Sequence, residues 1–258
     1  MTKNVIKKGD FSALAEDYTK YRPSYNKMVV DLIFGSINKQ SKEIMVADIG
    51  AGTGIFTKLI LDKNPKQLYA VEPNDNMRLQ GEKFLPKGVN WIGAGAEATS
   101  LADNTFDLVS MASSFHWPDT KLALKEFNRI LNSNGTFVAL WNPRITELSE
   151  IETIIDNILK NDYSIKSRVS SGRSGITNNL TQLLKDSNLF SNVVYVESTD
   201  KVEVSPERYI GAWRSVNDIR SQLGEINFSK FISKVTDITK DLNHVEVHYM
   251  TRAWIAKK

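Results

Sequence analysis

The chain has 258 residues, a formal net charge of +3 at pH 7 and no cysteine, which excludes disulfides, thiolate metal sites and cysteine nucleophiles. Its lysines are scattered without a run of five or six like charges, so no basic tail for nucleic acid is expected. Residues 1–10 lack a secretory apolar run and no stretch approaches the ~18 apolar residues of a membrane span, so we expect a cytoplasmic protein.

Predicted strands and helices alternate along the first half of the chain. A helix is expected over residues 24–37 with Ser24 as its N-cap, followed by a short buried strand at 44–47. Such alternation is typical of βαβ units and a parallel sheet. The expected strands continue at 67–71, 89–92, 106–112, 136–141, 192–197 and 246–256, and the expected helices at 55–61, 120–131, 148–159, 180–189, 206–223 and 228–242.

The turn after the first strand carries three glycines at alternate positions, Gly50, Gly52 and Gly54. Glycine lets the backbone approach a ligand closely, and the following helix offers unpaired N–H groups to an anionic part of that ligand. A dinucleotide fingerprint would place its third glycine at position 55, which is Ile55. The spacing therefore disfavours a nicotinamide dinucleotide, although a nicotinamide-dependent oxidoreductase stays open as an alternative.

The second strand ends on an acidic residue, Glu72, which follows Gly50 at about the distance expected of a ribose-binding acid. A carboxylate at the carboxyl end of a strand can accept hydrogen bonds from both ribose hydroxyls. The sequence therefore predicts a nucleoside-containing ligand at this edge of the sheet.

Further segments continue this pattern. Residues 46–54 contain Asp-x-Gly-x-Gly-x-Gly, beginning at Asp48, and residues 95–109 read Gly-Ala-Glu-Ala-Thr-Ser-Leu-Ala-Asp-Asn-Thr-Phe-Asp-Leu-Val. Residues 113–117 read Ser-Ser-Phe-His-Trp, and residues 18–25 carry Tyr-x-x-x-Arg-Pro-x-Tyr. Together these motifs resemble the class I S-adenosylmethionine (SAM)-dependent methyltransferases, and within them the methyltransferase type 11 or trans-aconitate methyltransferase-like subgroup.

The resemblance implies an α/β fold with a Rossmann-like, seven-stranded sheet in the order 3-2-1-4-5-7-6, its seventh strand antiparallel and helices on both faces. It implies SAM as cofactor and in-line transfer of a methyl group to a small-molecule acceptor, with no metal. We expect the cofactor-binding residues to be Tyr18, Arg22, Asp48, Gly50, Ala51, Gly52, Gly54, Glu72, Pro73, Met77, Ala96, Glu97 and Ser113.

The acceptor is expected beyond the fourth strand. His116 lies there and is either a general base or a residue that positions the acceptor, whereas a purely structural role is the alternative. Trp117, Asn142 and Arg144 are expected to line the same pocket. No basic stripe with stacking aromatics is evident, so nucleic acid is disfavoured as the substrate. A protein that binds SAM without catalysis is a further alternative.

We expect one methyltransferase domain over residues 1–258, with a core at about 25–143 and 190–258. Segments at about 1–24, 145–190 and 206–242 are expected to form a helical cap over the carboxyl ends of the strands, where open α/β sheets bind ligands. Residues 166–175 are rich in Ser, Arg and Gly and are expected to be a flexible loop of that cap. The sequence does not indicate the acceptor or the oligomeric state.

Overall fold

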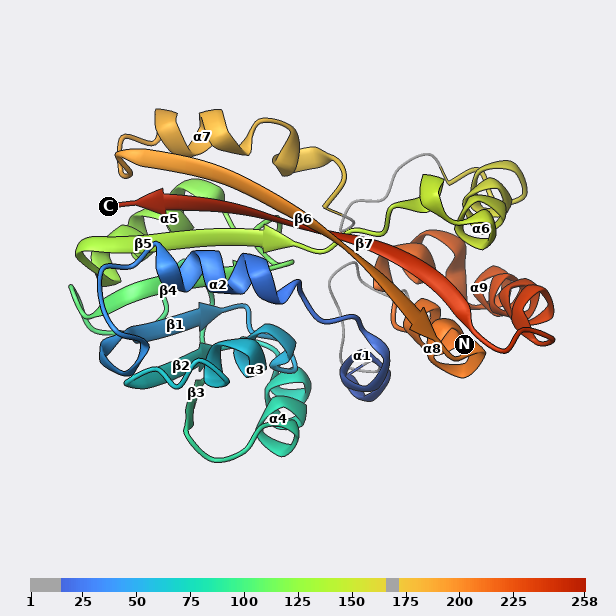
Figure 1. The fold of residues 1–258 in the computed structure, drawn as a ribbon, viewed down its shortest axis with the longest axis horizontal. Helices are drawn as coiled ribbons and strands as arrows, with labels where there is room; N and C mark the ends of the chain where they lie inside the picture. The colour runs from blue at the N-terminus through green and yellow to red at the C-terminus, as the bar shows by residue number, and fades with distance from the viewer. Residues whose placement is uncertain (1–14, 166–171) are drawn as a thin grey trace, which may run out of the picture.

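The computed structural model describes residues 15–165 and 172–258 and contains a seven-stranded sheet in the order β3-β2-β1-β4-β5-β7-β6 (Figure 1). Strand β7 is antiparallel to both neighbours and the other pairings are parallel. The predicted strand order and the antiparallel seventh strand are therefore confirmed. The strands are β1 Met45–Ile49, β2 Gln67–Val71, β3 Val89–Ile92, β4 Phe106–Ala112, β5 Leu131–Trp141, β6 Asn192–Val204 and β7 Val245–Lys257.

Helices cover both faces of the sheet because the buried strands are apolar on both sides. Helices α2 and α3 pack on one face and helices α5 and α7 pack on the other. The described helices are α1 Ala15–Tyr21, α2 Lys27–Gly35, α3 Ile55–Leu61, α4 Asp75–Phe84, α5 Thr120–Ile130, α6 Glu150–Asn161, α7 Leu180–Asp186, α8 Pro206–Arg214 and α9 Asn217–Thr239.

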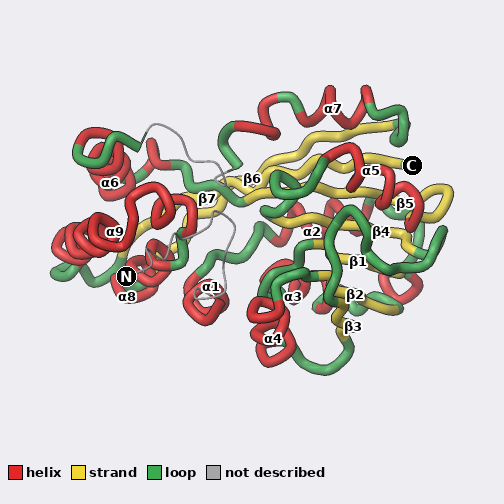
Figure 2. The backbone as a smooth tube through the Cα atoms, turned by 180° about the vertical axis from the view of Figure 1, so that it is seen from behind, coloured by secondary structure: helices red, strands yellow, loops and turns green. Residues whose placement is uncertain are grey.

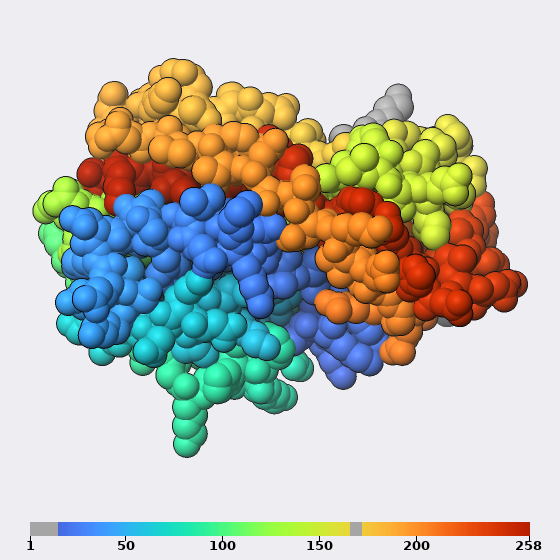
Figure 3. Space-filling model, viewed as in Figure 1, coloured from blue at the N-terminus to red at the C-terminus, as the bar shows by residue number. Residues whose placement is uncertain are grey.

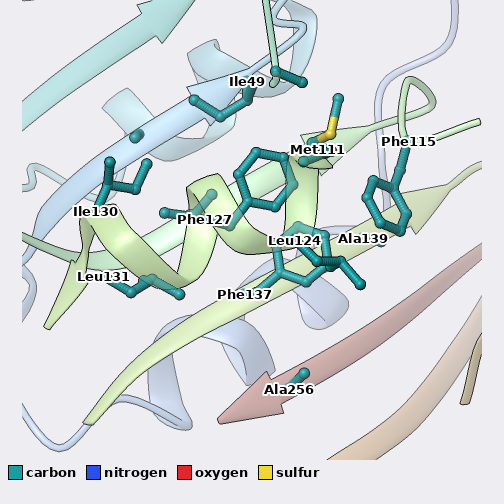
Figure 4. Packing of buried hydrophobic residues seen from close by; sticks show 14 of the residues in the cluster. Ile49, Met111, Phe115, Leu124, Phe127, Ile130, Leu131, Phe137, Ala139 and Ala256 are labelled. Atoms are coloured by element: carbon teal, nitrogen blue, oxygen red, sulfur yellow. The ribbon is translucent and has the colours of Figure 1, made fainter. Parts of the chain in front are cut away.

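The core on the α5 face is built around three phenylalanines (Figure 4). The ring of Phe137 on β5 lies 5.0 Å from that of Phe127 on α5 and 5.1 Å from that of Phe115, centroid to centroid. All three side chains are fully buried, and aromatic pairs at such separations stabilise a core beyond their buried area. This packing fixes the segment after β4, on which His116 and Trp117 lie.

A further apolar core lies in the cap, around the outer part of β6 and β7. It joins helices α6, α8 and α9 through residues such as Ile155, Trp213 and Phe231. The long β6–β7 hairpin connects the two halves, because Val245 and Val247 belong to the cap core whereas Ala253 and Ile255 belong to the sheet core. Figures 1 and 2 show the hairpin running from the sheet into the cap, and Figure 3 shows both halves side by side in one surface.

Several predicted boundaries were wrong. Helix α2 begins after Asn26, not Ser24, because the Asn26 side chain accepts hydrogen bonds from the N–H groups of Met28 and Val29 at 2.9 and 3.3 Å. The expected interruption at 224–227 is present, because Gly224 has non-helical backbone angles (φ 70°, ψ 165°) that divide α9 into two helical parts, but the helix expected over 206–223 is divided between α8 and α9. Strand β6 extends seven residues beyond the expected end at 197, because its outer part pairs with β7 inside the cap.

The predicted cap also requires a correction. Helix α7 lies within the segment 145–190 that we assigned to the cap, but its residues Leu180 and Leu184 are buried in the sheet core. The apolar side of α7 therefore covers β-strands instead of the carboxyl ends of the sheet. Residues 1–14 and most of the expected flexible loop, residues 166–171, lie outside the described residues.

Candidate active site

The glycine turn after β1 adopts a backbone that other residues rarely accept, with φ of 63° at Gly50 and 59° at Gly52. The N–H groups of Gly50 and Ala51 donate to the carbonyl of Val71 at 2.8 and 3.1 Å, which holds the turn against the end of β2. A Cβ on Gly50 would lie 2.8 Å from the Ser114 hydroxyl oxygen. Both the conformation and this close approach require glycine at position 50.

Asp48 lies behind this turn and is fully buried. The hydroxyls of Thr57 on α3 and Ser110 on β4 donate to its two carboxylate oxygens at 2.6 and 2.8 Å. Burial raises the pKa of Asp48 from 3.8 to about 6, although both hydroxyl bonds oppose the rise. Asp48 is not on the wall of the adjoining cavity, so it joins three elements beneath the turn.

Glu72 lies at the end of β2 and faces the same cavity. Its Oε2 accepts a hydrogen bond from the Gly52 N–H at 2.8 Å, and its Oε1 accepts one from the Asn74 N–H at 2.9 Å. Burial raises its pKa, while these two backbone bonds and Arg78 act in the opposite direction. Each oxygen keeps a second lone pair with which it can accept a ligand hydroxyl.

A cavity of about 470 Å³ lies between the carboxyl ends of the strands and the cap. Its volume is within the range of about 300–1,000 Å³ that is usual for small-molecule sites. It brings together most of the residues that the sequence predicted, namely Tyr18, Arg22, Gly50, Ala51, Gly52, Glu72, Pro73, Met77, Ala96, Glu97, Ser113, Trp117, Asn142 and Arg144. The predicted residues that do not line it are Asp48, Gly54 and His116.

Gly54 acts in the packing of the turn instead. It is the N-cap of α3 with φ of 83°, and a Cβ there would lie 2.7 Å from a terminal carbon of Leu85.

The segment around α1 closes one side of the cavity. The Arg22 guanidinium lies over the Tyr18 ring, 4.8 Å from its centroid, and Nη2 donates to the carbonyl of Ser215 at 3.1 Å. The buried Nε of Arg22 has no hydrogen-bond partner among residues 15–165 and 172–258. Arg22 therefore retains a donor and a positive charge beside the cavity.

His116 packs between two tryptophans, behind the cavity wall. Its ring centroid lies 4.5 Å from that of Trp117 and 6.3 Å from that of Trp141. The Trp141 Nε1–H donates to His116 Nδ1 at 3.4 Å. Trp117 is the member of this stack that lines the cavity. The base and positioning roles of His116 both stay predictions.

The cap contributes several polar or aromatic wall residues that the sequence did not single out: Glu152, Asp156, Arg173, Trp213, Asn217 and Tyr249. Glu152 follows Ser149 by three positions, and this spacing is the signature of a helix capping box. The local pattern therefore assigns Glu152 to the helix end. Only its long-range contacts reveal that it faces a site.

Arg144, which we predicted to line the acceptor pocket, is surrounded by charged and aromatic side chains. Its side chain is 16% exposed, and Nη1 lies 3.4 Å from Glu152 Oε1. The guanidinium is 4.3 Å from the Trp213 ring centroid and 5.3 Å from that of Tyr209. Burial would lower the pKa of Arg144, but Glu152 and the two tyrosines Tyr249 and Tyr209 raise it above its ordinary value, so Arg144 is charged.

Asn142 has a structural set of partners. Its Nδ2 donates to the Ser24 carbonyl at 2.7 Å, and its Oδ1 accepts from the Thr251 hydroxyl at 2.9 Å.

The described residues contain no group of three or more His, Asp or Glu side chains that could hold a metal ion. Across the same ranges, no helix has the length and apolar character needed to cross a membrane.

The methyltransferase domain family matches residues 47–139 in sequence. An uncharacterized methyltransferase-like protein of Schizosaccharomyces pombe is 33% identical over 56% of each chain. The chain thus spans little more than half the length of this curated relative.

Two solved structures share the fold. A candidate type II methyltransferase from Anaeromyxobacter dehalogenans superimposes with a TM-score of 0.68 at 14% identity, over 92% of this chain and 98% of the other. The SAM complex of Haemonchus contortus phosphoethanolamine N-methyltransferase 2 gives 0.54 at 14% identity, over 99% and 58%. Residues 47–139 thus match the methyltransferase domain family, and the sheet order of the chain is the one that the resemblance to class I SAM-dependent methyltransferases predicted.

Proposed function

We propose that this protein is a SAM-dependent methyltransferase that methylates a small-molecule acceptor. The observation that carries the proposal is the cavity in which the glycine turn, Glu72 and the cap residues around Arg144 face one another. One end of this cavity has the parts of a nucleoside site, and the other end has charged and aromatic side chains suited to a second ligand.

The residues at the sheet end fit SAM. Glu72 has free acceptor capacity for ribose hydroxyls, and the turn leaves room because no side chain projects from Gly50 or Gly52. Ala96 and Glu97 fit the adenine end, and Arg22 retains a donor for the carboxylate of the methionine portion. When bound, SAM supplies a sulfonium methyl group that a nucleophile of the acceptor displaces in line.

The protein then has to orient the acceptor and exclude water. Holding two reactants in line can supply up to roughly 7–11 kcal/mol of the barrier reduction. Trp117 and Trp213 provide an apolar wall, and the cap covers the carboxyl ends of the strands. Such a dry site favours a reaction in which the sulfonium charge disappears.

Binding of SAM tests the cofactor assignment. Replacing Glu72 with Gln removes the ionised acceptor and should weaken SAM binding by about 1–3 kcal/mol, measured by calorimetry. The matched control is Glu82→Gln on the exposed side of α4, which should leave the affinity unchanged. NADH binding more tightly than SAM to the wild-type protein would instead favour an oxidoreductase.

Turnover separates an enzyme from a protein that only binds SAM. A library of small-molecule acceptors should be screened with the full chain for SAM-dependent formation of S-adenosylhomocysteine. Product with at least one small molecule is the expected result. Tight SAM binding without product from any compound would support the non-catalytic alternative.

A further inference from the structure

The Glu152 side chain does not make the hydrogen bond at the start of α6 that its sequence position predicts. In a capping box its side chain would return to the N–H of Ser149. Here that N–H donates to the Thr146 carbonyl at 3.4 Å, while the Ser149 hydroxyl accepts from the Glu152 N–H at the same distance. The Glu152 carboxylate is directed into the cap instead, although it is only 1% exposed.

Two contacts hold this carboxylate in place, and both use the same oxygen. The Tyr209 hydroxyl on α8 donates to Oε1 at 2.7 Å, and Arg144 Nη1 lies 3.4 Å from Oε1. The other oxygen, Oε2, is buried and has no hydrogen-bond partner among residues 15–165 and 172–258. A buried acceptor without a partner costs about 1–3 kcal/mol, and more when it is charged, so this oxygen is suited to a donor from a ligand.

The cations at this end of the cavity already have carboxylate partners. Arg144 pairs with Glu152, and Arg173 pairs with Glu147 and donates to the Thr146 hydroxyl at 2.8 Å. A carboxylate acceptor would therefore compete with Glu152 or Glu147 for these cations. Asp156, one helical turn after Glu152, adds a second negative charge to the wall and pairs with Lys160 at 2.5 Å. The charged groups at this end of the cavity are thus paired, and the buried oxygen Oε2 of Glu152 is the acceptor that lacks a partner among the described residues.

We propose that Glu152 binds an N–H or O–H group of the methyl acceptor through Oε2, so that the site selects an amine or a hydroxyl compound over a carboxylate. This inference rests on the proposed function. Arg144 and Tyr209 orient the carboxylate, and the indole of Trp213, which lines the cavity beside Arg144, supplies an apolar wall for the rest of the acceptor.

Three probes of similar size test this selectivity: benzylamine, benzyl alcohol and benzoate. Their dissociation constants should be measured by NMR titration on the full chain saturated with S-adenosylhomocysteine. At least one of the first two probes should bind tenfold or more tightly than benzoate, and comparison of amine with alcohol tells which donor is preferred. Glu152→Gln should reduce that preference at least tenfold, because an amide is a weaker acceptor than a carboxylate.

Matched variants separate recognition from folding. Glu150→Gln changes an exposed carboxylate on the same helix and should leave all three constants unchanged. Tyr209→Phe keeps the Glu152 charge but removes the hydroxyl that orients it, so it should give an intermediate loss even if Glu152→Gln folds poorly. S-adenosylhomocysteine affinity should stay within twofold of wild type in each variant.

The possible contrary results are distinct. Benzoate binding most tightly, no discrimination among the probes, or an unchanged preference in both Glu152→Gln and Tyr209→Phe would each overturn the assignment of Glu152. Failure of the wild-type protein to bind S-adenosylhomocysteine would overturn the proposed function and this inference with it.

Discussion

Four buried carboxylates of the sheet half differ from Glu152 of the cap in how completely they are bonded. Asp48, Glu72, Asp107 and Glu126 each have hydrogen bonds to both oxygens. Glu152 in the cap has bonds to one oxygen only. Since an unmet buried acceptor is costly, full bonding favours a rigid frame, whereas partial bonding leaves capacity for a ligand. The sheet half is thus built to hold one geometry and the cap to receive a partner.

The same contrast appears around the loop at residues 95–101. Glu126 on α5 accepts bonds from the Thr99 N–H and hydroxyl at 2.8 and 2.6 Å, and from Arg129 Nε at 2.8 Å. These bonds, above all those from Arg129, lower the pKa of Glu126 to about 2, so it stays ionised and holds the loop. Oε2 of Glu152, by contrast, has no hydrogen-bond partner within the described ranges.

Breaking the buried Arg144–Glu152 pair of the cap should lower the unfolding free energy the most. Arg144→Met leaves Glu152 buried beside Tyr209 without its cation, which typically costs about 3–5 kcal/mol of unfolding free energy. Urea unfolding measures the loss. The double variant Arg144→Met with Glu152→Leu removes both charges and should recover most of the stability. If the single variant is as stable as wild type, the pair does not contribute to the cap, and the contrast between the two halves fails.

Titration of Asp48 should have the next largest effect on the unfolding free energy. Its folded pKa of about 6 lies above the ordinary value of 3.8, so the folded state binds more protons in this range. Stability should therefore fall as the pH rises from about 4 to 6, by up to roughly 3 kcal/mol from this group, since one pKa unit corresponds to about 1.4 kcal/mol. Asp48→Asn cannot ionise and should lack this contribution.

The measurement is the difference in unfolding free energy between wild type and Asp48→Asn across pH 4 to 7. The variant should gain on the wild type as the pH rises, while groups with lowered pKa values, such as Glu126, change both proteins equally. A difference that stays constant over this range would mean that Asp48 titrates at its ordinary pKa.

The sheet half was largely predictable because its signals are local. The strand, the glycine turn and Glu72 are read from short segments, and each contacts the others through backbone N–H groups at the end of the sheet. Met77, Ala96 and Ser113 follow from motifs that resemble a family. The errors in this half were a wrong cap residue at Ser24, an end of β6 placed too early, and the assignment of α7 to the cap.

The acceptor end was not predictable in the same way. Its central cluster joins Arg144, Glu152, Tyr209 and Trp213, which come from three separate segments and meet only because the β6–β7 hairpin carries the cap core. Local patterns even misassign Glu152, since Ser149-x-x-Glu152 reads as a capping box. The fourth-strand motif did place Trp117 at the cavity, but its neighbour His116 lies behind the wall.

Replacement of His116 should have the smallest effect on stability. It tests the comparison between the sheet half and the cap because His116 lies between the sheet core and the wall of the acceptor pocket. If His116 has a structural role behind the cavity wall, it accepts the hydrogen bond of the Trp141 indole N–H and packs against Trp117. His116→Ala should then cost about 1 kcal/mol in urea unfolding, because the indole N–H loses its acceptor. His116→Asn, whose side-chain oxygen lies near the position of Nδ1, should lose less. SAM affinity should stay within about twofold of wild type in both variants.

A general base would behave differently. Loss of such a base typically lowers turnover by about 10²–10⁴-fold, and asparagine cannot replace it because an amide does not take up a proton. With an acceptor found in the library screen, the two variants should therefore be compared by their rates and Michaelis constants from pH 5 to 8. We expect His116→Asn to keep a near wild-type rate and His116→Ala to raise mainly the Michaelis constant. Equal and large losses of turnover in both would assign proton removal to His116 and extend the acceptor site through the wall that Trp117 now forms.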